Sequence, residues 1–283
     1  MRRLAPLLLL VPLAAGCSSG SASSKLNVGP AKVYKLVDFR PDGTIRPNKP
    51  TTIAFTIQQP TGKPLTQFRT GAGPHTGVHL IIVRTDLSTI IHRHPPVEPS
   101  GHFTQSVIFP APGRYLVIVD TYPRHGPLPN FQLTKYLTVA GTAHAQPLGT
   151  YRVSTTVDGF HFTAPAKPQL RASQAQLLPF HVTGPNGKPA RFVLWYGALA
   201  HAIFFRAGTL DYFHSHVCPT GGTLAARRCA SFVGATRIAG HSSAPGELTV
   251  GILMPTPGTW KLFLQAKPDG HLVTVPYVLH VKP

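Results

Sequence analysis

The chain has 283 residues, of which 27 are Lys or Arg and only 9 are Asp or Glu, so its formal net charge at pH 7 is +18. Charged residues make up 13% of the chain and proline contributes 30 residues, a composition that argues against long surface helices. The basic residues are scattered and no nucleic-acid-binding motif occurs, so we expect no nucleic-acid partner. The excess positive charge instead suits a surface close to anionic lipid.

Residues 1–17 resemble a bacterial lipoprotein signal peptide. A basic start is followed by a short apolar stretch and by Leu13-Ala14-Ala15-Gly16-Cys17, which is similar to a lipobox. The apolar stretch is too short to span a bilayer. We therefore expect a lipidated (palmitate-bearing) Cys17, a flexible tether at 18–29 and an extracytoplasmic protein anchored to the cell membrane. An ordinary signal peptide with a chance cysteine is the alternative.

Downstream of the tether, short β-branched and aromatic runs alternate with turns rich in Gly and Pro. Examples are Thr52–Ile57, Val78–Val83, Thr104–Phe109 and Tyr115–Asp120. No stretch has a convincing 3.6-residue period. This pattern predicts an all-β protein made of antiparallel sandwiches of the immunoglobulin-like or cupredoxin-like kind.

The chain is also duplicated. The Gly-Lys-Pro sequence at 62–64 recurs at 187–189, and Pro-Ala-Pro-Gly at 110–113 recurs as Pro-Thr-Pro-Gly at 255–258. These elements keep the same order in both copies. The sequence therefore predicts two tandem sandwiches.

We place the first repeat at 30–140, a linker at 141–149 and the second repeat at 150–283. The second repeat is longer between its histidines and its Pro-Thr-Pro-Gly turn, and we assign the extra residues to an insertion at 217–245.

Both repeats contain the histidine pattern H-x12-H-x-H. The residues are His79, His92 and His94 in the first repeat and His201, His214 and His216 in the second. Side chains at i and i+2 of a strand point to the same face, and a turn can bring the first histidine beside the last two. Three converging imidazoles suit a divalent transition metal, Cu or Zn. We predict one three-histidine site in each repeat, for metal capture, buffering or delivery.

Other residues are candidates for a supporting role. His75 can complete the first site, and Asp86 and Asp211 can orient an imidazole as hydrogen-bond acceptors. The alternative is a structural or protein-binding lipoprotein without metal, in which the histidines stabilise a hairpin.

Cys218 and Cys229 are expected to form a disulfide within the insertion, because an extracytoplasmic compartment is oxidising. Metal ligation by Cys218 is the alternative. A blue-copper site is not expected, since the first repeat has no cysteine and Met254 is the only methionine after Met1.

An enzyme is not expected. The sequence has no H-E-x-x-H motif and no phosphate-binding loop, and its G-x-S-x-G match at 16–20 lies across the lipobox. A metal-dependent hydrolase or oxidase is the third hypothesis, because a three-histidine site with an open position can activate water.

The first repeat resembles a known pattern. HLIIVRTDLSTIIHRHP at 79–95, Gly101-His102-Phe103 and FPAPGRY at 109–115 are similar to HLxxVxxDLSxFxHxHP…GxF…FPxPGxY. That pattern is found in secreted or lipid-anchored bacterial β-sandwich domains of heavy-metal-associated envelope proteins. The resemblance implies an envelope location and envelope metal-handling proteins as partners. The second repeat departs from it, because the DLS turn is absent and Val217 follows His216.

Overall fold

The computed structural model describes residues 33–69, 77–126, 129–221, 229, 231–233 and 236–283. The expected signal peptide, Cys17, the tether and His75 lie outside the described residues. Residues 33–283 form one compact unit apart from its undescribed segments. In the part of the chain that the structure describes, no helix is long and apolar enough to cross a membrane.

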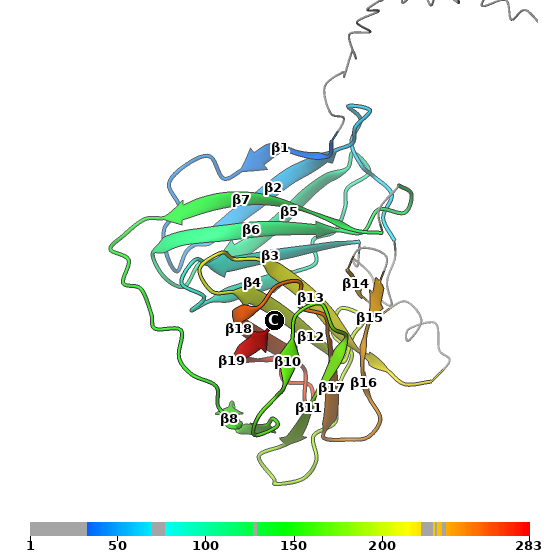
Figure 1. Ribbon diagram of the computed structural model, residues 1–283. Coiled ribbons are helices and arrows are strands. Elements are labelled where there is room, and N and C mark those ends of the chain that lie inside the picture. Colours follow the sequence, from blue (N-terminus) through cyan, green and yellow to red (C-terminus); the bar gives the residue numbers. More distant parts are fainter. Residues whose placement is uncertain (1–32, 70–76, 127–128, 222–228, 230, 234–235) are drawn as a thin grey trace, which may run out of the picture. The chain divides into compact units, whose positions relative to one another are not determined.

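The first repeat forms a sandwich of two antiparallel sheets (Figure 1). One sheet has the order β1-β2-β5 and contains Lys35–Arg40, Pro50–Gln58 and His102–Ile108. The other has the order β4-β3-β6-β7 and contains Ile90–Arg93, Val78–Arg84, Gly113–Thr121 and Phe131–Val139. Phe55, Phe103 and Tyr115 are buried in the core between these sheets.

The second repeat has the same strand order, which confirms the two tandem sandwiches. The counterpart of β1-β2-β5 is β9-β11-β17, formed by Phe160–Thr163, Gln176–Thr183 and Glu247–Ile252. The counterpart of β4-β3-β6-β7 is β13-β12-β18-β19, formed by Tyr212–Pro219, Ala200–Arg206, Gly258–Ala266 and Val273–Lys282. Phe180 and Trp260 lie in its core.

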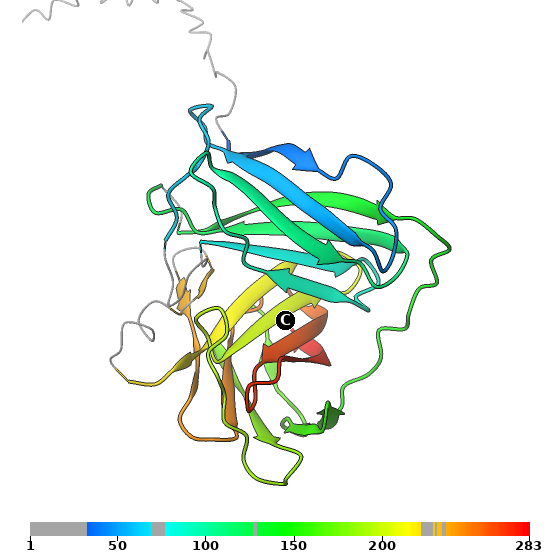
Figure 2. The same cartoon turned by 180° about the vertical axis from the view of Figure 1, so that it is seen from behind.

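The two sheets of the second sandwich are not separate, which differs from the expectation. β16 (Gly240–Ser242), from the insertion, pairs parallel with β13 and antiparallel with β17. It therefore joins both halves into one continuous sheet, seen from behind in Figure 2. The edges are completed by β8 (Ser154–Val157) and β10 (Leu170–Arg171), and β14 (Ser231–Val233) pairs with β15 (Thr236–Ile238) as a separate hairpin.

The repeated Pro-x-Pro-Gly turn has a physical cause. Gly113 has φ +128°, and a Cβ there would lie 2.9 Å from Nε of Arg84. That guanidinium donates to the carbonyl of Pro112 over 2.9 Å, so it occupies the space of the missing side chain. Gly258 and Arg206 repeat the arrangement in the second sandwich.

The sheet β4-β3-β6-β7 and its counterpart β13-β12-β18-β19 both have buried apolar side chains on their two faces, and this determines where the candidate site lies. In β3, Leu80 and Ile82 belong to the first core, whereas Ile81 and Val83 point to the opposite face. There they share a buried cluster with residues of the second repeat, namely Ile203, Phe205 and Phe263. The faces of β4-β3-β6-β7 and of β13-β12-β18-β19 that point away from the two cores therefore pack against each other. The strands β3 and β12 meet in this way near the middle of Figure 1.

Candidate metal centre

The histidines lie on the same packed faces. Strand alternation puts His79 on the face of Ile81 and Val83, and it puts His201 on the face of Ile203 and Phe205. The strands that carry the other histidines are direct neighbours: β4 pairs with β3, and β13 pairs with β12. The histidines of both repeats therefore meet where the two sheets pack, and all six are buried, with at most 8% of any residue exposed.

This arrangement differs from the expected pair of separate sites. Among the described residues, three groups of histidines have ligand nitrogens within 4.8 Å of one another: His79, His92 and His94; His79, His214 and His216; and His92, His201 and His214. Only the first group comes from a single repeat. The structure thus brings the predicted residues into one shared cluster, because the sheet faces that carry them pack against each other.

Two nitrogen–nitrogen distances within the cluster are short. Nε2 of His92 lies 3.0 Å from Nε2 of His94, and Nδ1 of His201 lies 3.3 Å from Nε2 of His214. Such pairs hydrogen-bond when no ion is present. Two ligands of a tetrahedral ion with bonds of about 2.0–2.1 Å also lie about 3.3 Å apart, so the spacing fits either state.

His92 has an acceptor that fixes its tautomer. Its Nδ1 lies 3.0 Å from Oε1 of Gln265, whose amide group donates to Thr274 over 2.9 Å. Because the amide oxygen accepts, Nδ1 carries the proton and Nε2 keeps its lone pair. A hydrogen bond from the distal ring nitrogen is the usual support of a metal-binding imidazole.

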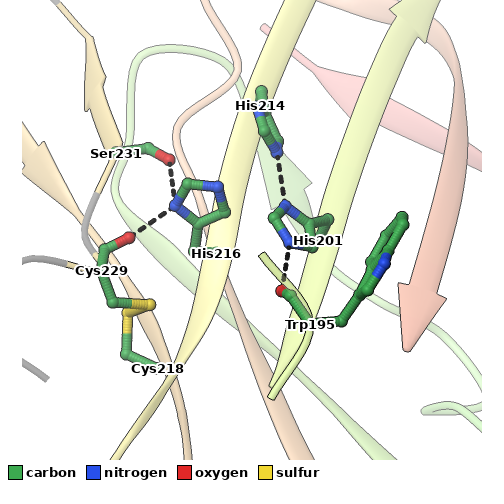
Figure 3. Close-up of a disulfide and its surroundings, with 7 residues drawn as sticks. All are labelled: Trp195, His201, His214, His216, Cys218, Cys229 and Ser231. Atoms are coloured by element: carbon green, nitrogen blue, oxygen red, sulfur yellow. Dashed lines mark hydrogen bonds between the residues drawn. A yellow bond between two sulfur atoms is a disulfide. The ribbon is translucent and has the colours of Figure 1, made fainter. Parts of the chain in front are cut away.

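His201 and His216 are held in the same way by backbone carbonyls. Nε2 of His201 donates to the Trp195 carbonyl over 2.9 Å, and Nδ1 of His216 donates to the Cys229 carbonyl over 2.5 Å. Both contacts are drawn in Figure 3. In each ring the other nitrogen keeps its lone pair.

A buried carboxylate, Asp120, lies between the remaining rings. Its Oδ2 is 3.8 Å from Nδ1 of His79 and 3.8 Å from Nδ1 of His214. The side chains of Tyr122, Tyr212 and Gln132 donate hydrogen bonds to it. Burial raises the pKa of Asp120 to about 6. These donors are neutral, so a nearby cation would stabilise the ionised carboxylate.

Asp120 and Gln265 hold equivalent places in the two repeats. Asp120 is the cross-strand partner of His79, and Gln265 is that of His201. Each reaches across to a histidine of the other repeat: Gln265 to His92, and Asp120 to His214. Each repeat therefore supplies a polar side chain that lies beside a histidine of the other repeat. In the first repeat this side chain is a carboxylate, and in the second it is an amide.

Burial keeps the imidazoles neutral, which is the form that binds metal. Desolvation lowers the pKa of His216 to about 4. Desolvation, followed by repulsion from neighbouring imidazolium charges, lowers the pKa of the other cluster histidines well below 6.5; these are His79, His92, His94, His201 and His214.

Three buried nitrogens in the cluster have no hydrogen-bond partner among the described residues: Nδ1 of His79, Nδ1 of His214 and Nε2 of His216. Buried polar atoms are normally satisfied, so these require an explanation. Nδ1 of His79 and Nδ1 of His214 face the carboxylate of Asp120, whereas Nε2 of His216 has a lone pair that an ion can accept. An all-imidazole donor set suits Cu(II) and Zn(II). The residues present therefore fit a metal.

The expected acceptors Asp86 and Asp211 do not support the histidines. Asp86 bonds Arg84, Ser88 and the backbone of Gln146, and Asp211 lies 3.7 Å from Arg206. Both follow the end of a seven-residue strand that starts near its histidine. Their partners Arg84 and Arg206 lie five residues along the strand from His79 and His201, about 16 Å at about 3.3 Å per residue.

The expected disulfide is present. Cys218 and Cys229 are bonded, with Cα atoms 5.7 Å apart. Cys218 is therefore not available as a metal-binding thiolate. Tyr196 is a further contact that the sequence did not indicate, since its ring stacks on His94 with centroids 4.0 Å apart.

The fold and the site define a class: all-β proteins of two like repeats that share one buried histidine cluster. The chain belongs to the family described as a domain of unknown function, DUF8832, whose model matches residues 32–129 and 155–283. No curated protein matches the sequence.

Several solved structures are similar over most of the chain, but weakly. The Escherichia coli adhesin FdeC is 12% identical, with a TM-score of 0.25 over 89% of this chain and 65% of that one. Invasin, a bacterial integrin-binding protein, is 14% identical, with a TM-score of 0.21 over 88% of this chain and 38% of its own. The α2-macroglobulin of E. coli is 12% identical, with a TM-score of 0.29 over 90% and 14%. Superpositions at these TM-scores say nothing about function.

Proposed function

We propose that this protein holds one divalent transition-metal ion, Cu(II) or Zn(II), in the cluster between its repeats. The observation that carries the proposal is that outer hydrogen bonds fix three imidazole rings and leave the lone pair of each on the other ring nitrogen. His92, His201 and His216 each donate from one ring nitrogen to a fixed acceptor. The other nitrogen of each ring is left for an ion.

The two groups that contain His214 are the best-supported ligand sets: His92, His201 and His214, and His79, His214 and His216. In each group the ligand nitrogens lie within 4.8 Å of one another. His92, His201 and His216 donate to Gln265 and to the carbonyls of Trp195 and Cys229. Nδ1 of His79 and Nδ1 of His214 each lie 3.8 Å from Asp120. In each group one ligand comes from the first repeat and two from the second. An ion bound here therefore joins the two sandwiches.

The burial of the cluster favours storage or transport of the ion over catalysis. A catalytic zinc or copper site keeps an open position for water or substrate. Here each histidine is at most 8% exposed, so a bound ion is shielded from bulk solvent. Metal capture, buffering or delivery by a lipid-anchored envelope protein, with envelope metal-handling proteins as partners, accounts for this burial together with the lipobox-like start of the sequence.

Calorimetric titration with Zn(II) and Cu(II) tests the proposal. We expect wild type to bind one ion and His214→Ala to lose at least about 10-fold in affinity, since that ring belongs to two of the three groups. His280→Ala is the matched control, because His280 is exposed and its ring contacts Thr259, away from the cluster histidines. Wild type that binds neither ion would overturn the proposal.

Tryptophan fluorescence gives a second, local readout. Trp195 is one of two tryptophans, and its ring centroid lies 5.1 Å from that of His201 and 5.3 Å from that of His92. Cu(II) bound in the cluster should quench its emission in step with the calorimetric titration.

A metal-free structural role is the second candidate, and the imidazole–imidazole contacts of 3.0 and 3.3 Å favour it. In that case the histidines hydrogen-bond one another and only hold the repeats together. His214→Ala would then lower stability, and added Zn(II) would leave the melting temperature of wild type unchanged.

A further inference from the structure

The insertion of the second repeat reaches back to the histidine cluster. His216 and Cys218 lie at i and i+2 of β13, so their side chains share a face. The partner of Cys218 is Cys229, whose carbonyl oxygen lies 2.5 Å from Nδ1 of His216. The Ser231 hydroxyl is 3.3 Å from the same nitrogen. Figure 3 shows His216 facing both groups, with the disulfide beside it.

We propose that the Cys218–Cys229 disulfide is a positioning element of the metal centre, because it holds the Cys229 carbonyl against His216. This inference rests on the proposed function. With Nδ1 donating to the carbonyl, Nε2 of His216 is the nitrogen that can bind an ion. That Nε2 is buried and has no hydrogen-bond partner in the part of the chain that the structure describes.

The disulfide is suited to this task because the segment that carries the carbonyl is outside the main sheet. Cys229 precedes β14, and among the described strands β14 pairs only with β15, in a two-stranded sheet. The disulfide ties this segment to β13. It is also buried, with Cys218 5% and Cys229 4% exposed, and it packs against Ala198 and Ala239. The covalent bond thus fixes a carbonyl that no strand of the main sheet fixes.

The equivalent histidine of the first repeat is held differently. His94 occupies the position of His216, and its ring stacks on Tyr196 with an interplanar angle of 9°. Both supports, the Tyr196 ring and the Cys229 carbonyl, come from the second repeat. His94 has an aromatic ring as its support, so the disulfide-bearing insertion is needed only beside His216.

The test compares Zn(II) affinity of the full chain with that of Cys218→Ala plus Cys229→Ala. We expect about 10- to 100-fold weaker binding, the usual effect of losing an outer hydrogen bond of a metal-binding histidine. In a His216→Ala background the same cysteine changes should cost less than about 3-fold, because the disulfide acts through that ring. Val250→Ala, a buried core change in the second repeat, is the control for lost stability and should leave affinity unchanged.

A second readout needs neither metal nor a variant. Long-range nitrogen-15 NMR of the metal-free wild type should show His216 protonated at Nδ1 and unprotonated at Nε2. The opposite tautomer would overturn the inference, as would a folded cysteine variant that binds Zn(II) like wild type. Wild type that shows the expected tautomer but binds no ion would overturn the proposed function and would leave the disulfide as a positioning element of His216 without a metal.

Discussion

Acidification should unfold the metal-free protein steeply below about pH 6.5. The six cluster histidines are neutral when folded, with pKa values below 6.5, and regain the ordinary pKa of about 6.5 when unfolded. The unfolded state therefore binds more protons below pH 6.5, so the free energy of unfolding falls as pH falls. Above pH 6.5 the contribution of these histidines is fully present.

Asp120 acts in the opposite direction but is a single group. Its pKa rises from 3.8 to about 6 in the folded protein, so between these values the folded state takes up one proton and gains stability. Each net proton is worth about 1.4 kcal/mol per pH unit, and the net effect is on the order of 5 kcal/mol per pH unit near pH 5.5. The free energy of unfolding of a domain is typically about 5–15 kcal/mol, so a fall of about one to two pH units below pH 6.5 should be enough to unfold the metal-free protein.

Circular dichroism and tryptophan fluorescence followed from pH 8 to pH 4 measure this transition. Saturating Zn(II) should move its midpoint to lower pH, because the ion competes with protons for the same nitrogens. Metal-free protein that keeps its native signals to pH 4 would contradict the account of the cluster's electrostatics.

Phe205→Ala should destabilise the protein by about 3–5 kcal/mol and also weaken metal binding. Phe205 is fully buried in the cluster of apolar side chains between the repeats, where it contacts Tyr212 and Phe263. A cavity there loosens the packing that brings His79 and His201 together. Guanidinium unfolding and Zn(II) calorimetry measure the two effects.

Phe204→Ala is the matched control for Phe205→Ala. It changes the same residue type on the same strand, but Phe204 points into the core of the second sandwich. It should cost a similar free energy of unfolding and leave Zn(II) affinity unchanged while the protein is folded. Equal effects of both substitutions on affinity would show that the packing between the repeats does not shape the site.

Much of the fold could be predicted from the sequence, because its signals are local. Short β-branched and aromatic runs, separated by turns such as the repeated Pro-x-Pro-Gly, indicate the strands of both sandwiches. The repeated H-x12-H-x-H spacing identified all six histidines of the cluster. The expected disulfide is confirmed. The extra strand β16 could not be predicted, because Gly240–Ser242 has no apolar pattern and pairs through backbone atoms.

The H-x12-H-x-H spacing predicted one histidine site in each repeat, and the single shared cluster was missed. One feature of the sequence does indicate that cluster. The runs Leu80–Val83 and Ala202–Phe205 are apolar at every position, which indicates strands buried on both faces. Asp120 and Gln265 were missed because only strand register places them beside histidines. Trp195 and Cys229 act through backbone carbonyls, which carry no side-chain signature.

The most direct test of the shared centre is the number of ions bound per chain, measured by native mass spectrometry. The comparison uses wild type, the first-repeat variant His92→Ala plus His94→Ala, and the second-repeat variant His214→Ala plus His216→Ala. A shared centre predicts one ion in wild type and loss of that same ion in either variant, because both repeats supply its ligands. Two ions in wild type and one ion retained in each variant would contradict it and restore two independent sites.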